Sequence, residues 1–415
     1  MRKLKDKLLK AAKIIRTLIK IIFIYYSYII LAIPYILLLL INKIKHLIKP
    51  PEKHNFAIVC YSYTIEISPF LKNICSYLYE NEYGTTDVYI DNQITRSNFL
   101  PQSGINIIKF NSLITDLLTK YILIDKKVLY IILLKLYLKP KLHKKVFAVD
   151  YPALDILNRI SFPLNRVIFL SLEGTDYMRH IPLKDVVKLL PKCQSHWIAS
   201  KERGQKINDF LNLNLDFTYF PISQRPKIEN IKTSSSSPKI IFSGYFAKWS
   251  MLEDLIDLNI NSFSFYPTTL YLQGHSYGTE KYLEIIKNKT RDQKNIIIDT
   301  NYYSDDEHHN LLSDFDIGLA FYKNPSSTDN FENMIFSSGK IASYLWAGLA
   351  VMTNIDCELT RKPPFIIIKN LNRDEYVKGI KIFQNNSEEF HKSAYNLAQS
   401  KYNFDIYMNK ILVNS

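Results

Sequence analysis

Short apolar runs alternate with amphipathic stretches along most of this 415-residue chain. In the first half, the runs at 56–61, 87–91, 146–150 and 167–172 have the length and the branched apolar content of buried strands. Stretches with helical spacing of apolar residues follow them, for example residues 68–80. This repeated order of strand, helix and strand predicts a parallel sheet and an α/β fold.

The second half of the chain repeats the pattern after a polar run at residues 233–238. An apolar strand is predicted at 239–245 and another at 295–299, with a helical pattern after the first of them. The length also suits two domains better than one core. We therefore expect an N-terminal domain at 54–222, a linker at 223–238, a C-terminal domain at 239–373 and C-terminal helices at 374–415.

Residues 337–354 read as an anion-binding turn, a helix and a buried strand in immediate succession. Two serines and a glycine at the helix start would offer hydroxyl and backbone N–H groups, and the helix dipole adds positive charge there. Lys340 would add a full charge. This is the arrangement with which a Rossmann-like domain binds a diphosphate.

The same run resembles the K-x-x-E-Y-x-x-x-G-x-P-V signature in the C-terminal half of GT-B glycosyltransferases, especially bacterial enzymes that build surface polysaccharide. Lys340, Tyr344, Gly348 and Val351 match the signature. Ser343 replaces a glutamate that hydrogen-bonds the ribose in that family, and the proline is also replaced, by Ala350. The resemblance extends upstream to a strand that ends in Ser243-Gly244 and to the Asp-Ile-Gly-Leu run at 316–319.

The resemblance implies two Rossmann-like domains of the GT-B type, with the donor in the cleft between them. It implies that protein groups neutralise the diphosphate without a metal ion, and that no cofactor is needed because the nucleotide-sugar is the substrate. The donor-contacting residues that it implies are Gly244, Lys248, Ser337, Ser338, Gly339, Lys340 and Ser343.

Glu173, Asp176 and His180 follow a predicted strand, where parallel sheets collect their ligands. Any of them could be the general base that deprotonates an acceptor hydroxyl, although a solvated loop explains each one equally well. The Asp-x-Asp at 314–316 reads as a helix end and a strand start, and residues 305–309 as an acidic helix N-terminus. We therefore expect no metal site.

Residues 1–53 carry twelve basic and two acidic residues, hence +10 of the chain's net charge of +14. The rest of the chain is close to neutral, so its composition does not indicate a nucleic-acid-binding protein. Between the basic blocks, residues 21–41 are uncharged and long enough to cross a bilayer, with Pro34 inside the run. Residues 1–53 are thus expected to be a helical, membrane-associated segment.

Two arrangements of this segment remain open. A spanning helix with its larger basic block inside would place the enzyme body away from cytoplasmic nucleotide-sugars. An interfacial or kinked segment would bind anionic headgroups and leave the body on the cytoplasmic face. The function expected from the resemblance is transfer of a sugar from a nucleotide-sugar to a lipid-linked or glycan acceptor in cell-surface glycan synthesis. The alternative, suggested by Ser343, is a non-catalytic, membrane-bound scaffold with the same fold.

Overall fold

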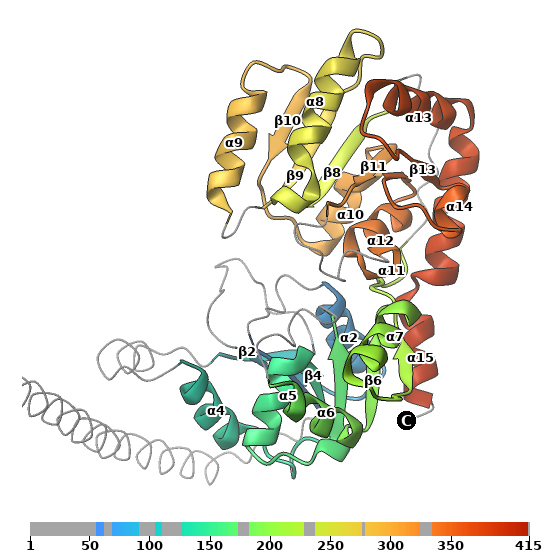
Figure 1. Ribbon diagram of the computed structural model, residues 1–415. Coiled ribbons are helices and arrows are strands. Elements are labelled where there is room, and N and C mark those ends of the chain that lie inside the picture. The colour runs from blue at the N-terminus through green and yellow to red at the C-terminus, as the bar shows by residue number, and fades with distance from the viewer. Residues whose placement is uncertain are drawn as a thin grey trace, which may run out of the picture.

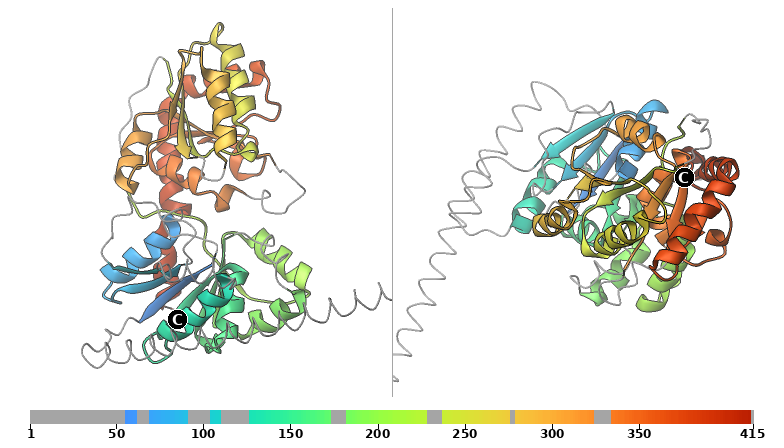
Figure 2. Two further views of the ribbon diagram at one scale, coloured as in Figure 1. Left: turned by 90° about the vertical axis from the view of Figure 1, so that its left-hand side faces the viewer. Right: turned by 90° about the horizontal axis from the view of Figure 1, so that it is seen from above.

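The computed structural model describes residues 55–61, 69–90, 104–109, 126–172, 182–227, 237–275, 279–323 and 334–413. Within these ranges the chain forms two separate sheets, and every strand pair is parallel. Figures 1 and 2 show each sheet inside its own α/β domain, one domain above the other. The fold class is therefore the one that the alternation of strands and helices predicts.

The N-terminal sheet has seven strands in the order β3-β2-β1-β4-β5-β6-β7. The strands are β1 Phe56–Cys60, β2 Thr86–Ile90, β3 Ile105–Lys109, β4 Lys145–Val149, β5 Val167–Ser171, β6 Ser195–Ile198 and β7 Phe217–Tyr219. Helices α4 Lys126–Tyr137, α5 Asp150–Arg159, α6 Leu183–Leu189 and α7 Lys201–Leu211 pack on one face through a shared apolar cluster. The other face is covered by α2 Pro69–Glu80 and by the last helix of the chain.

The C-terminal sheet has six strands in the order β10-β9-β8-β11-β12-β13. They are β8 Ile240–Tyr245, β9 Leu270–His275, β10 Ile296–Asp299, β11 Ile317–Ala320, β12 Ala350–Thr353 and β13 Phe365–Ile367. Helices α8 Leu252–Phe263, α9 Glu280–Thr290 and α13 Arg373–Asn385 cover one face. The opposite face carries α10 Asp305–Ser313, α11 Met334–Ser337, α12 Gly339–Trp346 and α14 Ser387–Lys401.

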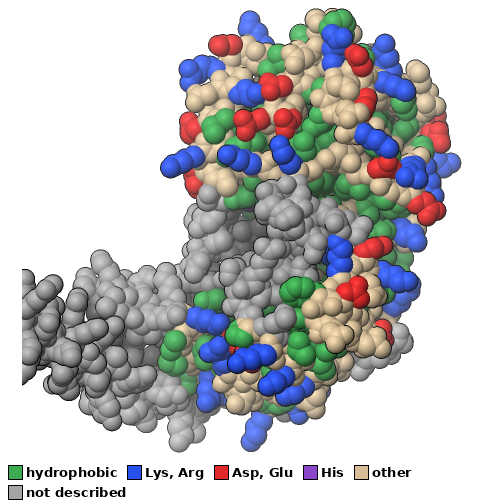
Figure 3. All heavy atoms as spheres, viewed as in Figure 1, with side chains coloured by type: hydrophobic (Ala, Val, Ile, Leu, Met, Phe, Trp, Pro, Cys, Tyr) green, Lys and Arg blue, Asp and Glu red, His purple; other side chains and the backbone are tan. Residues whose placement is uncertain are grey.

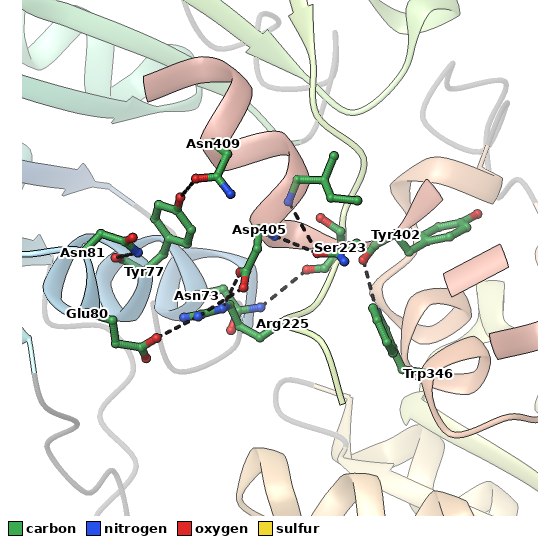
Figure 4. Close-up of polar contacts among 12 residues, drawn as sticks. Asn73, Tyr77, Glu80, Asn81, Ser223, Arg225, Trp346, Tyr402, Asp405 and Asn409 are labelled. Atoms are coloured by element: carbon green, nitrogen blue, oxygen red, sulfur yellow. Dashed lines mark hydrogen bonds and ion pairs between the residues drawn. The ribbon is translucent and has the colours of Figure 1, made fainter. Parts of the chain in front are cut away.

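The last helix, α15 Phe404–Val413, leaves the C-terminal domain and returns to the N-terminal one, as Figure 1 shows. Phe404 and Met408 are completely buried in the apolar cluster that also contains α2. Arg225 reinforces this return, since its guanidinium contacts both Glu80 of α2 and Asp405 of α15 (Figure 4). The two ends of the described chain therefore share one core.

None of the helices that the structure describes combines the length and the apolarity required to cross a bilayer. The predicted membrane segment at 1–53 lies outside the described residues, and so does most of the predicted linker at 223–238. The prediction for residues 1–53 stays a prediction.

Replacement of Phe404 by alanine tests the return of α15. We expect Phe404→Ala to destabilise the N-terminal domain by about 3–5 kcal/mol, because it opens a cavity in a core that also holds Phe70 and Phe220. Ile406→Ala is the matched control, since Ile406 lies on the same helix and is 39% exposed. Urea unfolding followed by tryptophan fluorescence measures both variants. Equal midpoints would mean that α15 is not part of the core.

Candidate functional site

The carboxyl ends of the strands in the two sheets face each other, and three contacts across the gap establish this. Lys72 near the start of α2 pairs with Asp305 at the start of α10 (Nζ to Oδ1, 3.4 Å). Arg203 in the first turn of α7 donates to the sulfur of Met334 at 3.8 Å. The N–H of Ile222 donates to the carbonyl of Phe336 at 2.8 Å. Ligand sites in parallel α/β sheets form at these strand ends, so the candidate site lies here.

Two paired glycines lie at the carboxyl ends of neighbouring strands in the C-terminal domain. Gly244, near the end of β8, has φ +153°, and its partner in β9, Gly274, has φ +158°. A Cβ on Gly274 would lie 1.8 Å from the carbonyl oxygen of Gly244, so no side chain fits there. A Cβ on Gly244 would lie 3.0 Å from Cε of Lys340. The space beside Gly244 is therefore bounded by the lysine side chain.

Helix α12 starts opposite Gly244. Ser338 fixes its first turn, and Tyr344 fixes its second. Ser338 is the N-cap, with its hydroxyl accepting from the N–H of Ile341 at 3.4 Å and bonded to the Tyr322 hydroxyl. The buried hydroxyl of Tyr344 accepts from the N–H of Ser243 at 2.7 Å and reaches the carbonyl of Leu319 at 3.2 Å. Strands β8 and β11 therefore hold the helix in register with the glycine turn.

Lys340 is the distinctive group of the site. Its ammonium lies 4.0 Å from the ring centre of Phe242, 5.2 Å from that of Tyr322 and 5.9 Å from that of Trp249. The Nζ atom is inaccessible to solvent, although the stem of the side chain is only half-buried. Among the residues that the structure describes, it has neither a hydrogen-bond acceptor nor a carboxylate partner.

This environment changes the acid–base behaviour of Lys340. Removal of the ammonium from water disfavours its charged form, and burial lowers the pKa of Lys340 to about 7. The aromatic faces offset part of this desolvation through cation–π attraction. The described residues supply no counter-ion for this cation, so an incoming phosphate would provide both the charge and the acceptors that they lack.

The other residues predicted to contact the donor differ in their surroundings. Ser337 ends α11 with a buried hydroxyl that bonds to none of the described residues, so it remains available. Gly339 packs against Ile222 of the N-terminal domain, where a Cβ would lie 3.6 Å from that side chain. Lys248 is exposed in the turn after β8. The predicted site residues are brought around α12, but only Lys340 and Gly244 face each other.

Ser343 points to the junction of the domains and is already bonded. Its hydroxyl donates to the carbonyl of Gly339 at 2.9 Å and accepts from the amide of Gln224, which follows β7. Ser343 is buried, with 7% of its surface exposed. The position that carries the ribose-binding glutamate in the resembled family is therefore used here to join the two domains.

On the N-terminal side, a fixed peptide group leads directly to the predicted bases. The N–H of Leu172 donates to Oδ1 of Asp150 at 2.9 Å, and its carbonyl accepts from Nη1 of Arg203 at 2.9 Å. Asp150 itself has the uncommon left-handed φ of +56° at the end of β4. Glu173, Asp176 and His180 lie outside the described residues. Leu172 is the last described residue before them.

The described residues contain no group of three or more His, Cys, Asp and Glu side chains suited to a metal ion. Asp316 accepts from the N–H of Lys239 at 2.8 Å, so it closes a sheet connection. Residues Ser304 and Glu307 form a capping box at the start of α10. His308 bonds to Ser243 at 2.7 Å, and burial lowers the pKa of the imidazole.

Sequence reasoning missed several residues of this site. The rings of Phe242, Tyr322 and Trp249 surround the ammonium of Lys340, Gly274 lies directly beside Gly244, and Gln224 donates to the hydroxyl of Ser343. The matching Ser243-Gly244 and Gln273-Gly274 pairs at the ends of neighbouring strands were a signal for Gly274. Nothing local in the sequence indicates that three aromatic rings meet at one lysine.

Comparison with solved structures identifies the fold. The trehalose-6-phosphate synthase from E. coli bound with UDP-2-fluoro glucose is similar over 86% of this chain and 98% of its own, with a TM-score of 0.63 and 10% identity. HepE from Anabaena in complex with UDP and glucose is similar over 86% of this chain and 98% of its own, with a TM-score of 0.58 and 12% identity. A glycosyltransferase from Rickettsia africae is similar over 87% of this chain and 97% of its own, with a TM-score of 0.56 and 12% identity. The chain has the GT-B fold.

These similarities extend over both domains, and identities this low establish the fold alone. No protein-family model matches the chain, and no curated protein sequence does. The two-domain GT-B architecture expected from residues 239–245, 316–319 and 337–354 is therefore confirmed, whereas the surface-polysaccharide type is not distinguished from other GT-B glycosyltransferases.

Replacement of Lys340 by methionine tests its burial. Without ligand, Lys340→Met should stabilise the protein by on the order of a few kcal/mol below pH 7, because an apolar side chain of similar length has no desolvation cost. Unfolded lysine titrates near pH 10.4, so the gain should shrink as the pH rises above 7, where folded Lys340 is already neutral. Thermal unfolding between pH 6 and 9 measures it. A destabilised variant at every pH would place the ammonium in water or beside an anion.

Proposed function

We propose that this protein is a glycosyltransferase that moves a sugar from a nucleotide-sugar to an acceptor in the cleft between its two domains. The GT-B fold supports this, because the similar proteins include structures with bound UDP, UDP with glucose, and UDP-2-fluoro glucose. The observation that carries the proposal for this chain is the buried ammonium of Lys340, which has no partner among the described residues and faces the space beside Gly244.

The chemistry of sugar transfer explains why such a lysine is useful. The nucleoside diphosphate leaves the anomeric carbon with growing negative charge, so a preorganised cation in a site that excludes water stabilises the transition state. Lys340 and the N–H groups at the start of α12 would contact the diphosphate. Gly244 would let the phosphates approach the backbone of β8, and Ser337 would donate its hydroxyl, which bonds to none of the described residues.

The acceptor is expected to bind on the side of the N-terminal domain. The attacking hydroxyl needs a base, and Glu173, Asp176 and His180 remain our proposals for it. They follow Leu172, which Asp150 and Arg203 hold at the carboxyl edge of the N-terminal sheet. We further propose a metal-independent reaction without a cofactor, a membrane-associated protein with its catalytic body on the cytoplasmic face, and a lipid-linked or glycan acceptor in cell-surface glycan synthesis.

Ser343 bears on donor recognition. Since its hydroxyl is engaged by Gln224 and by the Gly339 carbonyl, we propose that the ribose of the donor is recognised without a carboxylate at this position. The alternative of a non-catalytic scaffold also starts from this substitution. A buried cation that none of the described residues compensates favours the enzyme, because a scaffold gains nothing from the cost of burying that charge.

Thermal stabilisation by UDP and UDP-glucose tests the site. Both should raise the melting temperature of the full chain, and Lys340→Ala should lose the effect together with sugar transfer. Lys378→Ala, an exposed lysine of α13, is the control that should keep both. Stabilisation by UDP with no hydrolysis or transfer from any nucleotide-sugar would favour the scaffold. Equal stabilisation of Lys340→Ala would contradict the assignment of the site.

The pH dependence of UDP binding gives a second test. Above pH 7 Lys340 is increasingly neutral in the free protein, and the diphosphate binds its charged form. The dissociation constant of UDP should therefore rise by up to about tenfold per pH unit above 7. Lys340→Arg should bind with little pH dependence, because arginine stays protonated. Calorimetry between pH 7 and 9 compares the two, and parallel profiles would show that another group governs binding.

A further inference from the structure

The amino edge of the N-terminal sheet is a basic surface where strands β4, β5 and β6 begin, on the side of the domain opposite to the candidate site. In a parallel α/β sheet, crossover helices run against the strands, so helix C-termini and the starts of strands collect at one edge. Eight exposed basic residues lie there, and we call them the basic edge: Lys135, Lys139, Lys141, Lys144, Arg159, Arg166, Lys188 and Lys192.

Contacts between the connections show that these residues form one surface. Arg166, which precedes β5, donates from Nη1 to the carbonyl of Pro140 in the α4–β4 connection at 2.9 Å. Lys192 precedes β6, whose start is joined to β5 by the bond from the N–H of Gln194 to the carbonyl of Val167 (2.8 Å). On the face of this domain that Figure 3 shows, Lys and Arg side chains predominate over Asp and Glu.

The lysines of the basic edge are not paired with acidic side chains. Among the described residues, Arg159 has a carboxylate partner, Asp155, but no ion pair is formed by the six lysines. Between residues 126 and 195, the described acidic residues are buried or half-buried. The exposed acidic residues of the amino edge, Glu82, Asp209 and Asp216, lie in the segments before β2 and β7, to either side of the basic edge. The surface of the other domain differs, because Lys287, Lys289, Arg361, Lys369 and Arg373 each pair with an acidic residue there.

Helix dipoles account for only part of this pattern. A basic residue in the last turn of a helix is favourable, which explains Lys135, Arg159 and Lys188. Lys139 also satisfies the end of α4, since its ammonium donates to the carbonyl of Lys135 at 3.1 Å. Lys141 and Lys144 belong to the connection after α4 and have no such role. Uncompensated like charges in one region repel one another, so their clustering indicates an anionic partner.

The place where the described chain begins identifies that partner. Asn55 stands at the start of β1, and its carbonyl accepts from the N–H groups of Lys144 and Lys145 at 2.9 and 3.1 Å. The first 53 residues, with a net charge of +10 and the uncharged apolar run at 21–41, are therefore joined to the body at the basic edge itself. An anionic bilayer suits both, since an apolar segment needs hydrocarbon and the basic residues beside it need headgroup charge.

We propose that the basic edge docks the N-terminal domain on an anionic lipid surface. Residues 1–53 would supply one attachment, and the basic edge a second one that sets the orientation of the body. Stable anchoring of a peripheral protein generally takes two such signals. The docked protein would turn its cleft away from the headgroups, because the cleft lies at the opposite edge of the same sheet.

Lysine labelling of the full chain on vesicles tests the proposal. With vesicles of equal parts phosphatidylcholine and phosphatidylglycerol, an amine-reactive reagent read by mass spectrometry should label Lys139, Lys141, Lys144 and Lys192 several-fold more slowly than in solution. Lys281, Lys378, Lys381 and Lys392 on α9, α13 and α14 are equally exposed and should be labelled at unchanged rates. Bound protein with no protection of the first set would overturn the proposal.

Charge reversal provides the second measurement. A full chain with Lys139, Lys141, Lys144 and Lys192 changed to Glu should partition at least tenfold less onto the anionic vesicles, since each basic residue near such a surface contributes roughly fivefold. Reversal of the four control lysines has the same net charge and should have a much smaller effect. Equal losses in both variants, or protection by a soluble acidic glycan and not by vesicles, would contradict lipid docking.

Discussion

The candidate site depends on one unfavourable interaction: the Lys340 ammonium is buried, and none of the described residues supplies a counter-ion. Several features are arranged to make this burial possible. The rings of Phe242, Tyr322 and Trp249 supply an attractive surface, Ser338 caps the helix that carries the lysine, and Gly244 leaves room beside the charge. A folded protein retains such a cost where function requires it, and a diphosphate is the kind of ligand that removes the cost on binding.

The position of this lysine relative to an acceptor depends on the junction between the domains. The return of α15 places Phe404 and Met408 in the N-terminal core, and Arg225 joins α2 to α15 (Figure 4). Gln224, the residue before Arg225, bonds to Ser343, which lies less than one turn from Lys340 along α12. Gln224 and Arg225 thus link the N-terminal core and the domain junction to α12, the helix of the phosphate site. A change in the angle between the domains would therefore move α12.

The sequence was sufficient for the fold class and for the helix that carries Lys340, and insufficient for the details of the site. Buried parallel strands such as β1, β4 and β12 are continuous apolar runs, which a periodicity argument finds. Strands β3 and β13 are edge strands that the sequence analysis did not predict, although Ile105–Lys109 and Phe365–Ile367 are rich in the β-branched and aromatic residues that favour strands. The bond between Gln224 and Ser343 spans 119 residues, and only the tertiary arrangement creates it.

The parallel arrangement of the N-terminal sheet also assigns different tasks to its two edges. Asp150, Leu172 and Arg203 lie at the carboxyl edge, beside the candidate site. The eight residues of the basic edge and the attachment of residues 1–53 lie at the amino edge. Five-residue strands separate the two by roughly 17 Å before any loop is counted. A body docked through the amino edge would therefore keep its reaction centre well above the headgroups. The acceptor best suited to that geometry is one whose reacting hydroxyl extends away from the membrane, as the growing end of a glycan does.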